Sequence, residues 1–463
     1  MITKLQNEPR PKPASFRALS PAAIMDIARD REQALSRVLM AYISTGLIFM
    51  LLPGTFLGVW NLLQISGRES AGSVSPAWLQ AHGHAQIFGW IGSFILGIGF
   101  HSIPKRRGDR PPPTRAAWVC WIGWTAGVAM RWTANIYPWH WRALLPVSGA
   151  LELAGFLLFF ATVSRHRPED AGQKKLEPWI WAVIAASSGF FLALAANLAA
   201  CVWLAWRGAG PALPHVLDQR YLAVITWGFL VPFIWAFSAR WMHVFLGLRP
   251  ARTRLLAAAV VANFAGVVSA VLGSEALAAI LLLAGAGLAI VAIRMFEPAV
   301  HEPKTRGLHT SFPYFVRLAY AWMLIAALLE AAAVRWDTSG GFWGASRHAL
   351  TVGFVAMMVL SVGQRILPAF AGMRLLWSTR LMFAGLLLLA IGCVLRVSSE
   401  VLAYQEYAGW AWSVLPMSAV LELLGITSFA VNIFGTFLLQ PSHAVRQPMT
   451  IEIEQPASPQ VRI

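Results

Sequence analysis

Residues 145–155 read LPVSGALELAG and residues 415–425 read LPMSAVLELLG, two copies of the pattern L-P-x-S-x-x-L-E-L-x-G. Each copy lies inside an apolar segment long enough to cross a bilayer, which takes about 20 residues of helix. Glu152 and Glu422 are the acids of the pattern, and each falls well inside its segment. A pattern that occurs twice within such segments indicates a membrane protein assembled from repeated units.

Matching residues extend the repeat on both sides of this pattern. The first copy also contains His84, Ala85, Gly89, Gly99, Pro104, Thr114, Arg115 and Arg131, and the second contains His348, Ala349, Gly353, Gly363, Pro368, Thr379, Arg380 and Arg396. A fainter third copy lies between them, where Gly228 aligns with Gly89 and Thr253-Arg254 with Thr114-Arg115. We therefore expect three repeats, over about 36–164, 179–297 and 313–438.

The composition supports a membrane class for the whole chain. Hydrophobic residues make up 57% of the 463 residues and charged residues 13%, about half the roughly 25% usual in soluble domains. Mean hydropathy is +0.59. Twelve segments qualify as spanning helices, at about 36–64, 80–103, 115–137, 142–164, 179–206, 220–246, 253–272, 275–297, 313–334, 346–370, 379–398 and 410–438. With four helices in each repeat the copies run parallel, which predicts closure around a pseudo-threefold axis normal to the membrane.

The charge pattern predicts the orientation. The net charge is +16, but the basic residues gather in loops after the even-numbered segments, such as Lys105-Arg106-Arg107, rather than on a surface typical of nucleic-acid binding. Basic loops stay in the cytoplasm, so both termini are expected there. Residues 1–35 then form a basic cytoplasmic tail, 36–440 a single membrane domain, and 441–463 a second tail. The tail at residues 1–35 lacks the pattern of a signal peptide, and the three cysteines lack metal-ligand spacing.

Ionisable groups inside a membrane are candidates for function. His84 and His348 occupy equal positions in two repeats, with Ala223 in the third. Two facing imidazoles are the ligands of a six-coordinate haem iron; the alternative is a pair of histidines that bond neighbouring helices. His82 lies two residues from His84 and so faces nearly the opposite way on a helix. The alignment favours His84, which leaves His82 for a second site or for the membrane interface.

Two arginines and two glutamates complete the candidate set. Arg131 and Arg396 are expected near the outer ends of their helices, where they could pair with haem propionates or reach the lipid headgroups. Glu152 and Glu422 lie deeper, as partners in buried ion pairs or members of a proton path.

Two segments resemble a known family. His82-Gly83-His84-Ala85-Gln86-Ile87-Phe88-Gly89-Trp90 is similar to the H-x-H-x-x-x-F-G-F/W segment of the NnrS family, and residues 348–353 read H-A-L-T-V-G, as in that family. The resemblance implies a bacterial inner-membrane protein of twelve helices that contains haem and copper and is associated with denitrification and nitric oxide tolerance. It also implies a distant likeness to subunit I of haem–copper oxidases, where histidines of helices two and ten hold a low-spin haem.

The chain departs from the family pattern in the tenth helix. The run G-H-T-G-R is replaced by Ala371-Gly372-Met373-Arg374, which removes a histidine that copper could use. Helix seven also has no histidine, which argues against an oxygen-reducing centre. The sequence thus predicts a b-type haem protein of NnrS type, with nitric oxide as a candidate gas ligand and an unidentified electron donor. A secondary transporter and an oxidase-like scaffold without metals are the alternatives.

Overall fold

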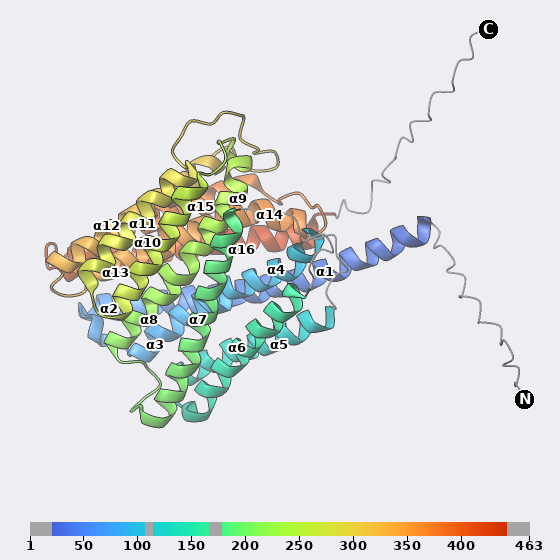
Figure 1. Cartoon of the computed structure of the whole chain (residues 1–463). Helices are drawn as coiled ribbons and strands as arrows, with labels where there is room; N and C mark the ends of the chain where they lie inside the picture. The colour runs from blue at the N-terminus through green and yellow to red at the C-terminus, as the bar shows by residue number, and fades with distance from the viewer. Residues whose placement is uncertain (1–20, 107–113, 166–177, 442–463) are drawn as a thin grey trace, which may run out of the picture.

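The structure, a computed structural model, describes residues 21–106, 114–165 and 178–441, and within these ranges the chain forms twelve long helical rods (Figure 1). Eight rods are single α-helices: α5 (Thr114–Ile136), α6 (Trp141–Ser164), α7 (Pro178–Arg207), α10 (Thr253–Val271), α11 (Glu275–Ile293), α12 (Phe312–Trp336), α15 (Thr379–Tyr404) and α16 (Ala411–Leu439). A 3-10 turn, η2 (Ala71–Ser73), lies in one loop.

The other four rods each contain a π-helical segment. They are α1 (Pro21–Phe49), η1 (Met50–Phe56) and α2 (Leu57–Arg68); α3 (Pro76–His84), η3 (Ala85–Gly92) and α4 (Ser93–Arg106); α8 (His215–Ile225), η4 (Thr226–Leu230) and α9 (Val231–Leu246); and α13 (Gly341–His348), η5 (Ala349–Ala356) and α14 (Met357–Phe370). Helix α1 begins at Pro21, so the end of the predicted N-terminal tail is helical. The rest of that tail and residues 442–463 lie outside the described residues.

Eleven of the twelve rods are long and apolar enough to span a membrane, which confirms a polytopic membrane protein. The remaining predicted span, 115–137, corresponds to α5, a helix of 23 residues, about 35 Å long at 1.5 Å per residue. It is absent from the eleven candidate spans. Trp118, Trp121, Trp124 and Trp132 together with Arg131 lower its mean hydropathy, although Trp124 is fully buried.

The rods pack in an order that closes into a ring. Within successive parts of the chain, α5 packs on α6, α10 on α11 and α15 on α16. Between these parts, α6 packs on α7, α11 on α12, and α16 returns to α2. The last helix therefore closes the bundle against the first rod, and segments far apart in sequence become neighbours.

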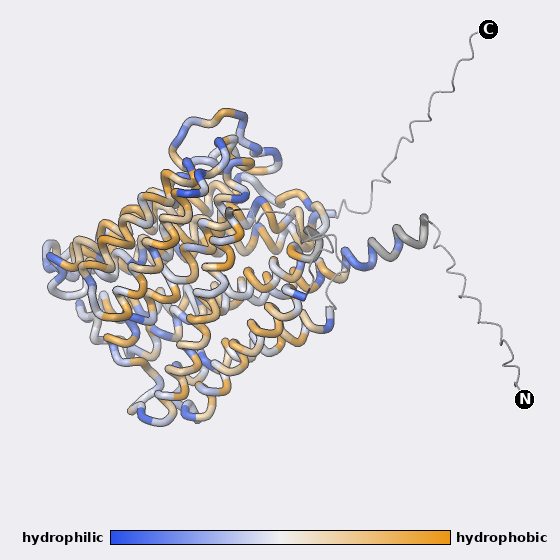
Figure 2. Tube along the Cα trace, viewed as in Figure 1, coloured by the Kyte–Doolittle hydropathy of each residue, from blue (hydrophilic) through white to orange (hydrophobic). Residues whose placement is uncertain are grey.

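The helices are mostly apolar along their length and polar at the ends and turns, as Figure 2 shows. Leu52, Val261 and Leu438 are 64%, 69% and 78% exposed, an arrangement that suits a surface in contact with lipid. The turns α2–α3, α5–α6, α7–α8, α10–α11, α12–α13 and α15–α16 each join an odd-numbered rod to the rod that follows it, so in an up-and-down bundle they lie at one end.

Glycines allow the helices to approach closely. A Cβ on Gly189 of α7 would overlap the carbonyl oxygen of Gly228 in η4. A glycine in α11, Gly287, has nothing within 4 Å of the same position. Close backbone contact through small residues is a common way for membrane helices to associate.

Gly189→Ala should therefore lower the free energy of unfolding by about 1–3 kcal/mol, because the methyl group forces α7 away from η4. The matched change Gly287→Ala should leave stability unchanged or slightly raised, since alanine favours helix. Thermal unfolding in detergent measures both, and equal midpoints would contradict the close approach.

Candidate functional site: two buried clusters

The buried charged side chains of the described residues form two clusters. Arg131, Glu152, Arg396, Glu400 and Glu422 are each less than 9% exposed. Isolated charges at this depth are costly, so charged groups that persist there are paired or functional.

The first cluster joins α3, α5, α6 and α7. His84 Nε2 lies 2.8 Å from Glu152 Oε1, and Asn197 donates to Glu152 Oε2 at 3.1 Å. Arg131 Nη1 lies 2.7 Å from the sulfur of Cys201, one turn beyond Asn197 on α7. Because a carboxylate oxygen only accepts, His84 carries its proton on Nε2.

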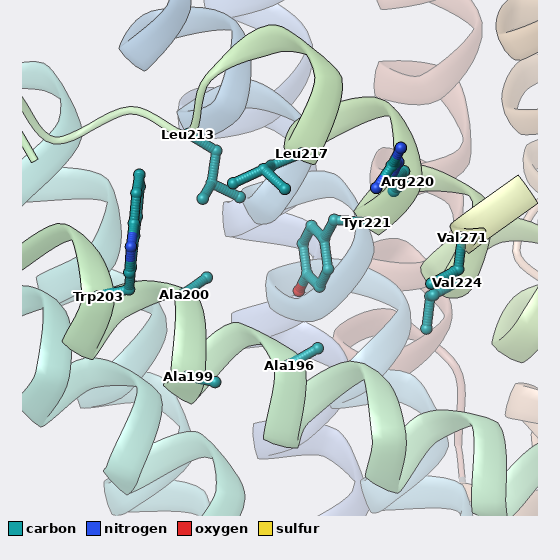
Figure 3. Close-up of a pocket in the computed structure, with 10 residues that line it drawn as sticks. All are labelled: Ala196, Ala199, Ala200, Trp203, Leu213, Leu217, Arg220, Tyr221, Val224 and Val271. Atoms are coloured by element: carbon teal, nitrogen blue, oxygen red, sulfur yellow. The ribbon is translucent and has the colours of Figure 1, made fainter. Parts of the chain in front are cut away.

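A groove of about 360 Å³ lies beside the first cluster, between α7, α8 and α10 (Figure 3). Its lining is almost entirely apolar, with alanines of α7 on one side and Leu217 and Val224 of α8 on the other. The hydroxyl of Tyr221 points towards α7. This hydroxyl is buried without a hydrogen-bond partner in the described part of the chain, within electrostatic range of Arg131 and Glu152.

The second cluster joins α13 and α15, with Glu422 of α16 close by. His348 Nδ1 donates to the carbonyl of Gly344 at 2.9 Å, one turn earlier, and Arg396 Nη2 lies 3.2 Å from His348 Nε2. Glu400 Oε2 lies 2.8 Å from His348 Nδ1 and 3.5 Å from Arg396 Nε. Since Nδ1 carries the proton given to Gly344, Nε2 presents a lone pair to the guanidinium.

His82 lies near the second cluster. Its Nδ1 donates to the carbonyl of Gly54 in η1 at 2.8 Å, and it lies within electrostatic range of His348 and Arg396. Its ring sits over α2, where a Cβ on Gly58 would come within 2.6 Å of His82 Cε1. The glycine at position 58 is what leaves room for the imidazole.

The three histidines therefore divide by the ring nitrogen that carries the proton. In His82 and His348 a backbone carbonyl fixes the proton on Nδ1, the arrangement that orients Nε2 as a metal ligand. In His84 the Nε2 is already committed to Glu152. His84 and His348 nevertheless hold the same local position, each ending an α-helix immediately before a π segment, a feature frequent at functional sites.

The predicted site residues are thus brought together in two groups. Arg396 lies with His348, whereas Arg131 and His84 share the first cluster. No hydrogen bond joins His84 to His348 in the described ranges. Sequence reasoning missed Glu400 because it ended the helix at 398, although a glutamate four residues after a buried arginine is the spacing of a helical ion pair.

A metal held by several side chains has no counterpart among the described residues, where no three His, Cys, Asp or Glu side chains gather closely enough to hold one ion. The described residues therefore offer no such three-ligand set for a copper ion. A haem makes a smaller demand, because its ring supplies four nitrogens and the chain only the axial ligands.

These features define a class: a polytopic helical membrane protein with histidine, arginine and glutamate clusters inside its bundle. Comparison with family models matches residues 40–442 to the NnrS protein family, so the chain belongs to the NnrS family. A search among curated proteins finds no match.

The first cluster predicts a coupled pair of substitutions. Arg131→Met and Glu152→Leu should each cost about 3–5 kcal/mol in the free energy of unfolding, because each leaves buried charge uncompensated. The double variant should recover part of that loss. The chain itself has a leucine at the corresponding contact in another repeat. Leu282 of α11 packs on Gly266 of α10 as Glu152 of α6 packs on Gly127 of α5. Additive losses in thermal unfolding would show that the two charges do not compensate each other.

Proposed function

We propose that the protein binds a b-type haem within the membrane and acts in nitric oxide metabolism or nitrosative-stress tolerance. The observation that carries the proposal is the matched state of His82 and His348: Nδ1 of each donates to a backbone carbonyl, at 2.8 Å and 2.9 Å. Imidazole with Nε2 as the free nitrogen is the usual axial ligand of haem iron. Family membership supports the same cofactor.

The chain's own residues would have distinct roles. His348 and one histidine of the second rod would hold the iron, and the proton positions favour His82 over His84 for that partner. Arg396, whose Nη1 is buried without a hydrogen-bond partner in the described chain, would bind a propionate, which suits the planar guanidinium. Arg131 is committed to Cys201, which supports a structural role for it.

Haem supplies reversible one-electron chemistry and an iron that binds small gases when an axial position is free. Two strong axial ligands would make the protein an electron carrier or redox sensor, and a labile one would admit nitric oxide. His348 also lies against Arg396 and Glu400, so it has alternative partners and would be the ligand that yields.

We further propose the orientation and symmetry given by the sequence, with both termini in the cytoplasm of a bacterium and three repeats around a pseudo-threefold axis of the inner membrane. Matched contacts support the repeats. A Cβ on Gly127, Gly266 or Gly392 would come within 2.9 Å of Glu152, Leu282 or Glu422 respectively. The π segments of the second, sixth and tenth rods occupy corresponding places.

A transporter would be favoured by helices broken at mid-membrane. Pro53 lies within η1 and Pro232 just after η4, but both rods continue as helices through these positions. This continuity supports the haem proposal over transport. A scaffold without metals is the remaining alternative, which retention of haem would exclude.

The proposal is tested by the dithionite-reduced minus oxidised absorption spectrum of protein purified from cells supplied with iron and haem precursor. The wild type should give Soret and α bands, and His348→Ala should lose them or shift them to high spin. His140→Ala, in the exposed loop between α5 and α6, is the control and should match the wild type. Wild-type protein without haem, or a His348→Ala spectrum identical to the wild type, would overturn the proposal.

A further inference from the structure

The buried charges do not balance in number. Among the described residues, the buried arginines are Arg131 and Arg396, and the buried glutamates are Glu152, Glu400 and Glu422. One acid has no arginine of its own. An unpaired carboxylate at this depth takes up a proton rather than remain charged, because burial disfavours the ionised form.

The two clusters identify the surplus acid, because they differ at one position. Four residues after Arg131 the chain has Asn135, whereas four residues after Arg396 it has Glu400. In the second cluster the guanidinium therefore has a carboxylate on its own helix, 3.5 Å from Nε. Glu422, which matches Glu152 in its contact with a glycine of the preceding helix, is left over.

Hydrogen bonds support this assignment. Both oxygens of Glu152 have partners, His84 and Asn197. Glu422 Oε1 has none in the described chain, although the residue is only 8% exposed. The charged groups within electrostatic range of Glu422 are Arg396 and Glu400, both on α15, and the thiol of Cys393 lies on the same helix.

We propose that Glu422 is a proton-binding site, held as the neutral acid within the membrane while Arg396 pairs with Glu400. Arg396 Nη1 is itself without a hydrogen-bond partner in the described residues, so a turn of the guanidinium towards α16 would pair it with Glu422. The carboxyl O–H bond of Glu422 would then break and the proton would pass to Glu400, which Arg396 has left and which is itself buried. The second cluster thus stores one proton, held by whichever of Glu422 and Glu400 is not paired with Arg396.

Isosteric glutamine variants test the protonation state, because glutamine resembles a protonated glutamate. In detergent, Glu422→Gln should unfold at nearly the wild-type temperature. Glu152→Gln, at the matching position, should unfold at a clearly lower temperature, because His84 and Arg131 lose their carboxylate. Equal losses for the two variants would overturn the proposal.

A double-mutant cycle tests whether Arg396 can pair with either Glu400 or Glu422. Glu400→Gln alone should be tolerated in part, since Glu422 can ionise and replace the lost partner. Glu400→Gln/Glu422→Gln should lose far more than the sum of the single losses, because Arg396 then has no carboxylate. Additive losses would contradict the proposal.

Infrared spectroscopy gives an answer even if the double variant does not fold. The wild type should show a protonated-carboxyl band that exchanges in heavy water, is absent in Glu422→Gln and persists in Glu152→Gln. In Glu400→Gln the band should weaken as Glu422 ionises. A band unaffected by Glu422→Gln would overturn the proposal. None of these measurements needs haem, so they stand apart from the test of the proposed function.

Discussion

Water is absent from the interior of a bilayer, and this governs every polar group in the structure. Backbone N–H and C=O groups form hydrogen bonds within the helices. A charged side chain can persist there only where another side chain or a backbone carbonyl forms an ion pair or hydrogen bond with it. The exterior therefore becomes apolar while Arg131, Glu152, Arg396, Glu400 and Glu422 withdraw into the bundle. The two clusters are a consequence of this constraint, since each collects charges that the chain carries inside the bundle.

The two clusters share one backbone arrangement but differ in their hydrogen bonds. Gly127 and Gly392 each admit a glutamate from the next helix at the same place, yet the histidines take opposite proton positions. His84 gives Nε2–H to Glu152, whereas His348 gives Nδ1–H to Gly344 and keeps Nε2 for another partner. In the first cluster both oxygens of Glu152 have partners, although Arg131 Nε has none in the described residues. The second retains the unsatisfied Arg396 Nη1 and Glu422 Oε1, and it is the more suitable place for a cofactor.

Much of the fold could be predicted because hydropathy and repeat spacing act along the chain. The rods follow the predicted segments, and α12 and α16 differ from them by one or two residues at each end. Less of the candidate site could be predicted from the sequence. The repeat alignment predicts His84 as the partner of His348 because it compares positions in a repeat, whereas the proposal of His82 uses hydrogen-bond partners, which depend on the helix that lies opposite. His82 reaches Gly54 only because η1 packs against α3, a contact that no periodicity encodes. Glu400 was missed because its helix continues to Tyr404.

The proposed haem site rests on His82 and His348 as the pair whose Nε2 atoms carry no proton, whereas His84 gives its Nε2–H to Glu152. Electron paramagnetic resonance of the oxidised protein separates these roles most directly, since low-spin ferric haem with two imidazole ligands has its own signal. The account predicts that His84→Ala keeps the wild-type signal and that His82→Ala loses it. A signal lost in His84→Ala and kept in His82→Ala would contradict it.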